Sequence, residues 1–192
     1  ISGQPTSSVQ VRRGFGYNFL PAATTTVNAN TAALGASKAV TIEDNTTTYT
    51  PVSGAIASDI DFGSNARLNI TADLTIAAGT TITIGAGSVV RIAPGADIHV
   101  DGNLTVNASP AAPTTFAPTT PGSPWGGIFL QSTTSNVNIT GAIFYGSGAD
   151  QTWFDTHSGF ASHRPEQALF LLGPAGAQLD LSDCYLIENT GQ

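Results

Sequence analysis

The sequence has little charge, and almost none of it is lysine. Of its 192 residues, 10% are charged, with 13 Asp and Glu against 6 Lys and Arg, and the formal net charge is −7. Lys38 is the only lysine, and Arg12 and Arg13 are the only adjacent basic residues. Proteins that bind nucleic acid hold its phosphates with clusters of Lys and Arg. We therefore predict no nucleic-acid partner.

Sulfur and long apolar runs are also scarce. Met is absent and Cys184 is the single cysteine, so no internal disulfide can form, and we interpret the thiol as a small buried apolar group. No stretch approaches the roughly 18 to 20 continuous apolar residues that a membrane-spanning helix needs, which argues against membrane insertion. The chain starts at Ile1 without the pattern of a leader peptide, so we expect a mature product or an excised piece of a longer protein.

What the sequence does contain favours β-structure. Thr, Ser and Asn replace the missing charge, and 21 glycines and 11 prolines punctuate the chain. Between residues 66 and 108, apolar side chains come in pairs two positions apart, which is the spacing that places both on one face of a strand. The six pairs are Leu68/Ile70, Leu74/Ile76, Ile82/Ile84, Val90/Ile92, Ile98/Val100 and Leu104/Val106.

Three such pairs fit one turn of a coil. If position 68 stacks on 90, 74 on 98 and 82 on 104, the repeats are 22, 24 and 22 residues long and equivalent side chains form apolar columns. We therefore interpret the chain as all-β, a right-handed parallel β-helix of about five coils. A β-sandwich is the alternative, because short strands with regular turns fit that fold too. The residues expected on the outer faces are Thr75, Thr81, Thr83, Arg91, His99 and Thr105.

The rhythm covers only part of the chain. Residues 1–66 lack it and are assigned to an N-terminal extended and capping segment, and residues 67–192 are assigned to the β-helix. Two insertions are expected in the β-helix, at 109–124, which holds five of the eleven prolines, and at 146–166. The last coil would leave an apolar column and an unpaired strand edge open, which invites association.

The N-terminal segment offers candidates for that association. Two short stretches in it alternate like extended strands, which could cover the β-helix or reach into a neighbouring molecule. The candidate assembly residues are Val9, Val11, Phe15, Tyr17 and Phe19.

Residues 67–192 resemble a known kind of domain. The series LTIAAGTTITIGAGSVVRIAPGADIHVDGNLTV, an insertion ending in TTFAP and then PWGGIFL are similar to right-handed parallel β-helix domains of large secreted or surface-anchored bacterial proteins, including proteins that carry lamin-tail-like and CotH-kinase-like modules. Trp125, Gly126, Gly127 and Ile128 match the Trp-Gly-Gly-Ile of that pattern. The resemblance implies the fold and a location outside the cell or on its surface. No kinase-like motif occurs here, so the activity of the companion modules is not carried over.

The second insertion gathers chemically versatile side chains. A lyase of the β-helix fold would use carboxylates to hold Ca²⁺ against a uronate and an Arg or Lys as base. The candidate ligand-binding residues are Asp150, Trp153, Asp155, His157, His163, Arg164 and Glu166. The plainer interpretation is a surface loop that packs Trp153 and Phe160 on the β-helix and pairs Arg164 with a carboxylate. His157 and His163 stand six positions apart, which matches no standard zinc spacing, so no metal site is predicted.

No Ser-His-Asp order, phosphate-binding loop or dinucleotide fingerprint occurs in the chain. We therefore predict a non-enzymatic extracellular structural or adhesive β-solenoid, either a subunit of a self-assembling surface fibre or a rigid segment of a larger surface protein. Its expected partners are copies of itself or the rest of a longer parent chain. The alternative is a polysaccharide-binding or polysaccharide-lyase-like module that acts through residues 150–166. No cofactor is expected, and Ca²⁺ is the one ion that the sequence weakly suggests, chiefly with the lyase alternative.

Overall fold

A computed structural model describes residues 24–27, 38–41, 48–149 and 169–189 of the chain. The chain divides into two compact units, Ile1–Thr48 and Tyr49–Gln192. In the first unit, β1 (Thr24–Val27) and β2 (Lys38–Thr41) form an antiparallel pair. None of the described residues in either unit is helical.

The described part of the second unit is built from short strands. They are β3 (Thr50–Ile56), β4 (Ile60–Asp61), β5 (Arg67–Ile76), β6 (Thr81–Gly85), β7 (Val89–Ile92), β8 (Ile98–Val100), β9 (Asn103–Asn107), β10 (Thr114–Pro118), β11 (Ile128–Leu130), β12 (Asn136–Thr140), β13 (Ala142–Tyr145), β14 (Phe170–Leu172), β15 (Gln178–Ser182) and β16 (Tyr185–Ile187). Their shortness follows from the sequence, because glycines with positive φ, such as Gly79 and Gly95, turn the chain after a few residues.

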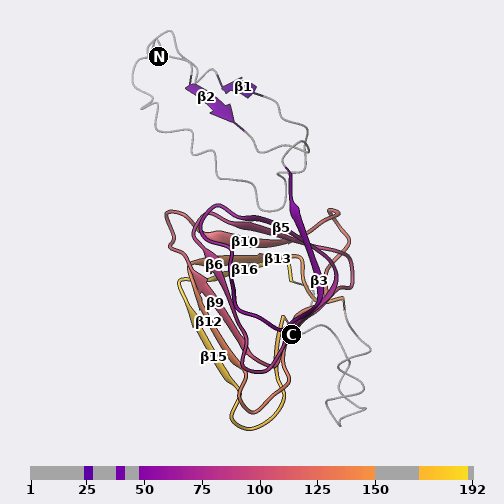
Figure 1. Cartoon of the computed structure of the whole chain (residues 1–192). Coiled ribbons are helices and arrows are strands. Elements are labelled where there is room, and N and C mark those ends of the chain that lie inside the picture. Colours follow the sequence, from indigo (N-terminus) through magenta and orange to yellow (C-terminus); the bar gives the residue numbers. More distant parts are fainter. Residues whose placement is uncertain (1–23, 28–37, 42–47, 150–168, 190–192) are drawn as a thin grey trace. The chain divides into compact units, whose positions relative to one another are not determined.

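The strands of the second unit pair in parallel. One sheet has the order β14-β11-β8-β5-β7-β10-β13-β16, with β3 beside β5, and the other has the order β15-β12-β9-β6-β4. Strand β5 serves two faces, because its residues 67–70 pair with β7 and its residues 74–76 pair with β8. Figure 1 shows these strands curling around a shared interior. The all-β class is confirmed, and the antiparallel sheets of a sandwich are not found among the described strands of this unit.

The predicted stacking of equivalent positions is the observed register. The Cα partners are Leu68 and Val90, Leu74 and Ile98, and Ile82 and Leu104. A slip of one residue would turn every inner side chain outward, so the alternating apolar pattern specifies this register strongly.

The core is formed by the inward members of the predicted pairs. All six pairs are buried, whereas the residues expected on the outer faces, such as Thr83 and His99, are half-buried. Phe116 stacks on Phe144 with ring centroids 4.9 Å apart, and Phe144 meets Phe170 edge to face at 5.1 Å. Full burial of each such apolar side chain stabilises the fold by about 1.5–3 kcal/mol. The interior is thus a set of columns that run from layer to layer.

Two stretches have a structure that differs from the one predicted from the sequence. Residues 49–66, assigned above to the N-terminal segment, contribute β3 and β4 to the parallel sheets, and Val52 packs against the core. Residues 109–124, interpreted as an insertion, contain β10, whose Phe116 is fully buried. The many prolines around this strand led to the prediction of a loop. Pro118 stands at the last position of the strand, where the loss of one backbone donor is tolerated.

Candidate functional site

The residues singled out from the sequence lie outside the described part of the chain. The loop candidates fall within residues 150–168 and the assembly candidates within residues 1–23. The ligand-binding set is Asp150, Trp153, Asp155, His157, His163, Arg164 and Glu166, and the assembly set is Val9, Val11, Phe15, Tyr17 and Phe19. The roles assigned to both sets therefore stay predictions.

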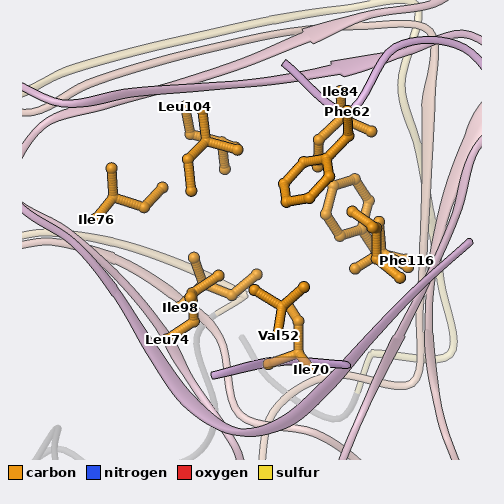
Figure 2. Close-up of a pocket in the computed structure, with 12 residues that line it drawn as sticks. Val52, Phe62, Ile70, Leu74, Ile76, Ile84, Ile98, Leu104 and Phe116 are labelled. Carbon is orange, nitrogen blue, oxygen red and sulfur yellow. The ribbon is translucent and has the colours of Figure 1, made fainter. Parts of the chain in front are cut away.

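The interior formed by the described strands of the second unit contains a small apolar hollow. Figure 2 shows apolar side chains pointing into a hollow between the strands, from Val52 and Phe62 at the first layers to Phe116. Every lining residue is apolar, and the cavity measures about 20 Å³. That volume holds about one water molecule, which would find no polar partner among these side chains. The hollow is a packing gap in the core.

One polar feature of the second unit lies at a corner where the chain bends between two faces. We call Asp73, Asp97 and His99 the corner cluster, because one ligand atom from each lies within 4.8 Å of the others. Asp73 occupies the exposed bend inside β5, and Asp97 directly precedes β8 in the next layer. The pairing of Leu74 with Ile98 stacks the two aspartates, since each stands one residue before a member of that pair.

Asp97 is held in place by contacts with the layers on both sides of it. Its side chain is buried, with 4% exposure, and its Oδ1 accepts a hydrogen bond of 2.8 Å from the N–H of Gly127. The N–H of Asp97 donates to Oδ1 of Asp73 at 3.1 Å. A Cβ on Gly126 would lie 1.7 Å from Oδ1 of Asp97, so only glycine leaves room for this carboxylate. The two glycines of the Trp-Gly-Gly-Ile stretch therefore provide the space and the hydrogen-bond donor for the Asp97 carboxylate.

The imidazole of His99 is also oriented by the next layer. Its Nδ1 lies 3.0 Å from Nε2 of Gln131, and its ring centroid lies 5.8 Å from that of Phe129. These contacts come from residues at and beyond β11, which pairs with β8. Two carboxylates and one imidazole so arranged can hold a divalent cation or form a hydrogen-bonded ionic cluster.

The corner cluster was not identified from the sequence, although the signal for it was present. His99 was placed correctly on an outer face, but the two aspartates were not connected with it. The predicted stacking of position 74 on 98 also puts 73 beside 97 and 75 beside 99. Reading the neighbours of each apolar pair, and not only the pairs, would have found the cluster.

A second feature is an apolar edge formed by the strands furthest along the chain. We call β14, β15 and β16 the C-terminal edge, because they end the described pairing order on three faces. Leu172, Leu181 and Leu186 are 47%, 38% and 56% exposed. Their partners one layer earlier are Leu130, Ile139 and Phe144, each 0% exposed. The side chains of each column are thus buried in one layer and exposed to solvent in the next.

In the described residues there is no helix of the length and hydrophobicity needed to span a membrane. Comparison of the chain with family models, curated proteins and solved structures returned no match.

Proposed function

We propose that the described strands of the second unit, β3 to β16, form a right-handed parallel β-helix and that the chain serves as an extracellular structural or adhesive solenoid. The registers support the β-helix, because strands separated by 22 or 24 residues in the sequence lie side by side. Apolar columns inside and polar rows outside are what a stacked coil requires. A body of this kind is stiff along its axis and repeats its outer faces at a constant spacing.

The C-terminal edge is the observation that carries the proposal. An open strand edge with exposed leucines is a template for further strands, and soluble proteins usually cover or blunt such an edge. Neither a charge nor a proline blunts β16, whose sequence is Tyr-Leu-Ile. We therefore propose that another layer of parallel strands stacks here, supplied by a second copy of the chain or by a following part of a longer parent.

Side-chain ladders on the outside support a mechanical role. Nδ2 of Asn103 donates to Oγ1 of Thr81 at 3.1 Å, and the hydroxyls of Thr140 and Ser182 are 2.9 Å apart. Each contact joins two adjacent layers, so the polar faces add to the stiffness that the core provides. The extracellular location rests on the resemblance of residues 67–192 to β-helix domains of secreted and surface-anchored bacterial proteins.

The test is the state of association of the purified 192-residue chain. We expect its mass in sedimentation experiments to rise with concentration and negative-stain images to show particles joined end to end. Replacing Leu181 and Leu186 together by lysine should leave a folded monomer, because two charges on the C-terminal edge oppose stacking. Thr105→Lys, which puts a charge on a side face, serves as the matched control and should associate like the unaltered chain.

Two results would count against this proposal. A chain that stays monomeric at every concentration contradicts self-assembly. Association that Thr105→Lys abolishes as fully as the double lysine variant contradicts the role of the C-terminal edge.

A further inference from the structure

We infer that residues 8–12 of one copy of the chain add a parallel strand to β15 at the C-terminal edge of a second copy. The inference rests on the stacking proposed above and names the segment that one copy supplies to the next. An extended segment that adds to an open sheet edge gains backbone hydrogen bonds from the edge and specificity from its alternate side chains. Each copy has one such segment and one such edge, so the contact repeats from copy to copy.

The sequence of residues 8–12 has the pattern of the strands that form the sheet of β15. Those strands are β6 (TITIG), β9 (NLTVN), β12 (NVNIT) and β15 (QLDLS), and each has Val, Ile or Leu at its second and fourth positions. Ser-Val-Gln-Val-Arg at 8–12 places Val9 and Val11 at those positions. Within residues 1–48 only 39–43 shares the pattern, and there β2 already pairs with β1. Residues 8–12 therefore fit the next position of this sheet.

Strand β15 has the open apolar surface that such a strand covers. Among the described strands it pairs with β12 alone, on one side. Leu181 is 38% exposed, whereas its partner Ile139 in β12 is 0% exposed. In a parallel register Val9 covers Leu179. Val11 then covers Leu181, and both apolar columns continue by one layer. Valine suits these positions because β-branched side chains pack well on a pleated surface.

The charges of the segment and of the edge are complementary. Residues 169–189 contain no Lys or Arg, and their three acidic side chains are exposed. These are Asp180, Asp183 and Glu188. In the parallel register Arg12 and Arg13 lie at the end of β15 that leads to Asp183, whereas antiparallel addition would place Arg12 beside Gln178. Opposite charges on neighbouring strands attract each other, so the charges favour the parallel direction.

The first layer of a second copy fits this edge less well. The paired positions on the outer face of this sheet, from β4 to β15, are Asp61, Thr83, Thr105, Asn138 and Asp180. If β4 of a second copy stacked on β15 in this register, Asp61 would lie against Asp180. Like charges at directly opposed positions of a sheet are destabilising. The segment that carries two arginines is therefore the favoured occupant of the edge.

An exchange of charge between segment and edge tests the inference in sedimentation experiments on the full chain. The segment variant is Arg12→Asp with Arg13→Asp, and the edge variant is Asp180→Arg with Asp183→Arg. Each should associate at least about tenfold more weakly than the unaltered chain. A mixture of the two should associate again, because each segment then meets an edge of opposite charge. Lys38→Asp reverses a charge of the first unit outside the segment, and this matched control should associate like the unaltered chain.

Disulfide formation between copies reports the direction of the added strand. Cys184, the native thiol, is first replaced by serine. A chain with Ser8→Cys is then mixed with a chain that carries Gln178→Cys. Parallel addition pairs these two positions, so mild oxidation should give a disulfide-linked heterodimer in mass spectra. Ser8→Cys mixed with Ser182→Cys is the control, since only antiparallel addition would pair those residues.

The outcomes separate this inference from the proposal on which it rests. An unaltered chain that never associates contradicts both. Association that the segment variant retains in full, or that the mixture fails to restore, overturns the inference alone and leaves stacking by other strands. Added salt should weaken association of the unaltered chain, because salt screens the attraction between opposite charges. Association that strengthens with salt, or a heterodimer that forms only in the cysteine control, overturns the inference as well.

Discussion

At the residue scale, the two glycines of the Trp-Gly-Gly-Ile stretch accommodate one carboxylate. Gly126 provides the space that Asp97 occupies, and Gly127 provides the N–H that it accepts. Trp125 is fully buried beside them, and its indole N–H donates to the carbonyl of Tyr145 at 2.9 Å. Gly126 and Gly127 thus contact the layer before, whereas Trp125 contacts the layer after, which explains why small and very large residues stand next to each other here.

Gly126→Ala tests this arrangement. The added methyl would overlap Oδ1 of Asp97, so the carboxylate must move and its bond to Gly127 is lost. Overpacking of a tight site costs about 1–3 kcal/mol. We expect the free energy of unfolding, measured by chemical denaturation, to fall by that amount.

A double-mutant cycle separates the overlap from other effects of alanine at this position. In an Asp97→Ala background the obstructing carboxylate is absent, so Gly126→Ala should cost clearly less than it does in the unaltered chain. Equal costs in both backgrounds would show that Asp97 is not what requires glycine here.

At the scale of elements, the parallel register is set by the alternation of short strands. Strand β6 pairs with β9 such that Ile82 meets Leu104 inside and Thr83 meets Thr105 outside. Because inward and outward positions alternate, the buried pairs determine which outer residues become neighbours. The polar rows on the outer faces are consequences of the core.

A pair of cysteines introduced at Thr83 and Thr105 should report this register. Paired residues of neighbouring strands lie about 4.8 Å apart, within the range of Cα separations that a disulfide accepts. We expect Thr83→Cys with Thr105→Cys, in the Cys184→Ser background, to lose its free thiols on mild oxidation.

The matched control is Thr81→Cys with Thr105→Cys, which shifts one cysteine by two residues on the same face. The Cα atoms would then be about 8 Å apart, too far for an unstrained disulfide. Thiol titration and mass spectrometry measure the oxidation. Equal oxidation of the two variants would contradict the register.

At the scale of the whole second unit, stability is expected to fall toward the C-terminal edge. Ile139 in β12 and Leu181 in β15 are paired positions of one column, with 0% and 38% exposure. Inner layers have neighbours on both sides, whereas the described strands of the C-terminal edge have a partner on one side only. Apolar contacts and buried backbone bonds are therefore fewer at this edge, which favours local opening.

Alanine substitutions along this column measure the gradient. Ile139→Ala should lower the free energy of unfolding by about 2–5 kcal/mol, since it opens a cavity in a fully buried site. Leu181→Ala should cost less than about 1 kcal/mol in dilute solution, because much of that side chain is already in water. Denaturation curves at low and high protein concentration would reveal both values.

The concentration dependence connects this gradient with the proposed stacking. If copies cover the C-terminal edge, the cost of Leu181→Ala rises with protein concentration while that of Ile139→Ala stays constant. A large cost for Leu181→Ala in dilute solution would contradict an open edge.

The sequence by itself determined the strands of the central layers and the register between them. Spacings of two within a pair and of 22 or 24 between equivalent pairs record which side chains face inward, and a buried face tolerates no slip. The sequence did not reveal β3 or β4, which lack the regularly spaced apolar pairs, or β10, which is surrounded by prolines. In those strands, pairing with an already formed neighbour supplies the order that the local pattern lacks.

Only the tertiary structure decided which polar groups meet and which apolar groups stay exposed. Asp73 and Asp97 are ordinary turn residues in the sequence, and stacking alone brings them to His99. Leu181 and Leu186 fit the same apolar pattern as the residues of inner layers, yet they are exposed because none of the described strands lies beyond theirs. The physical reason is that a local pattern specifies the face of a strand, whereas contacts between layers depend on what each layer finds above and below it.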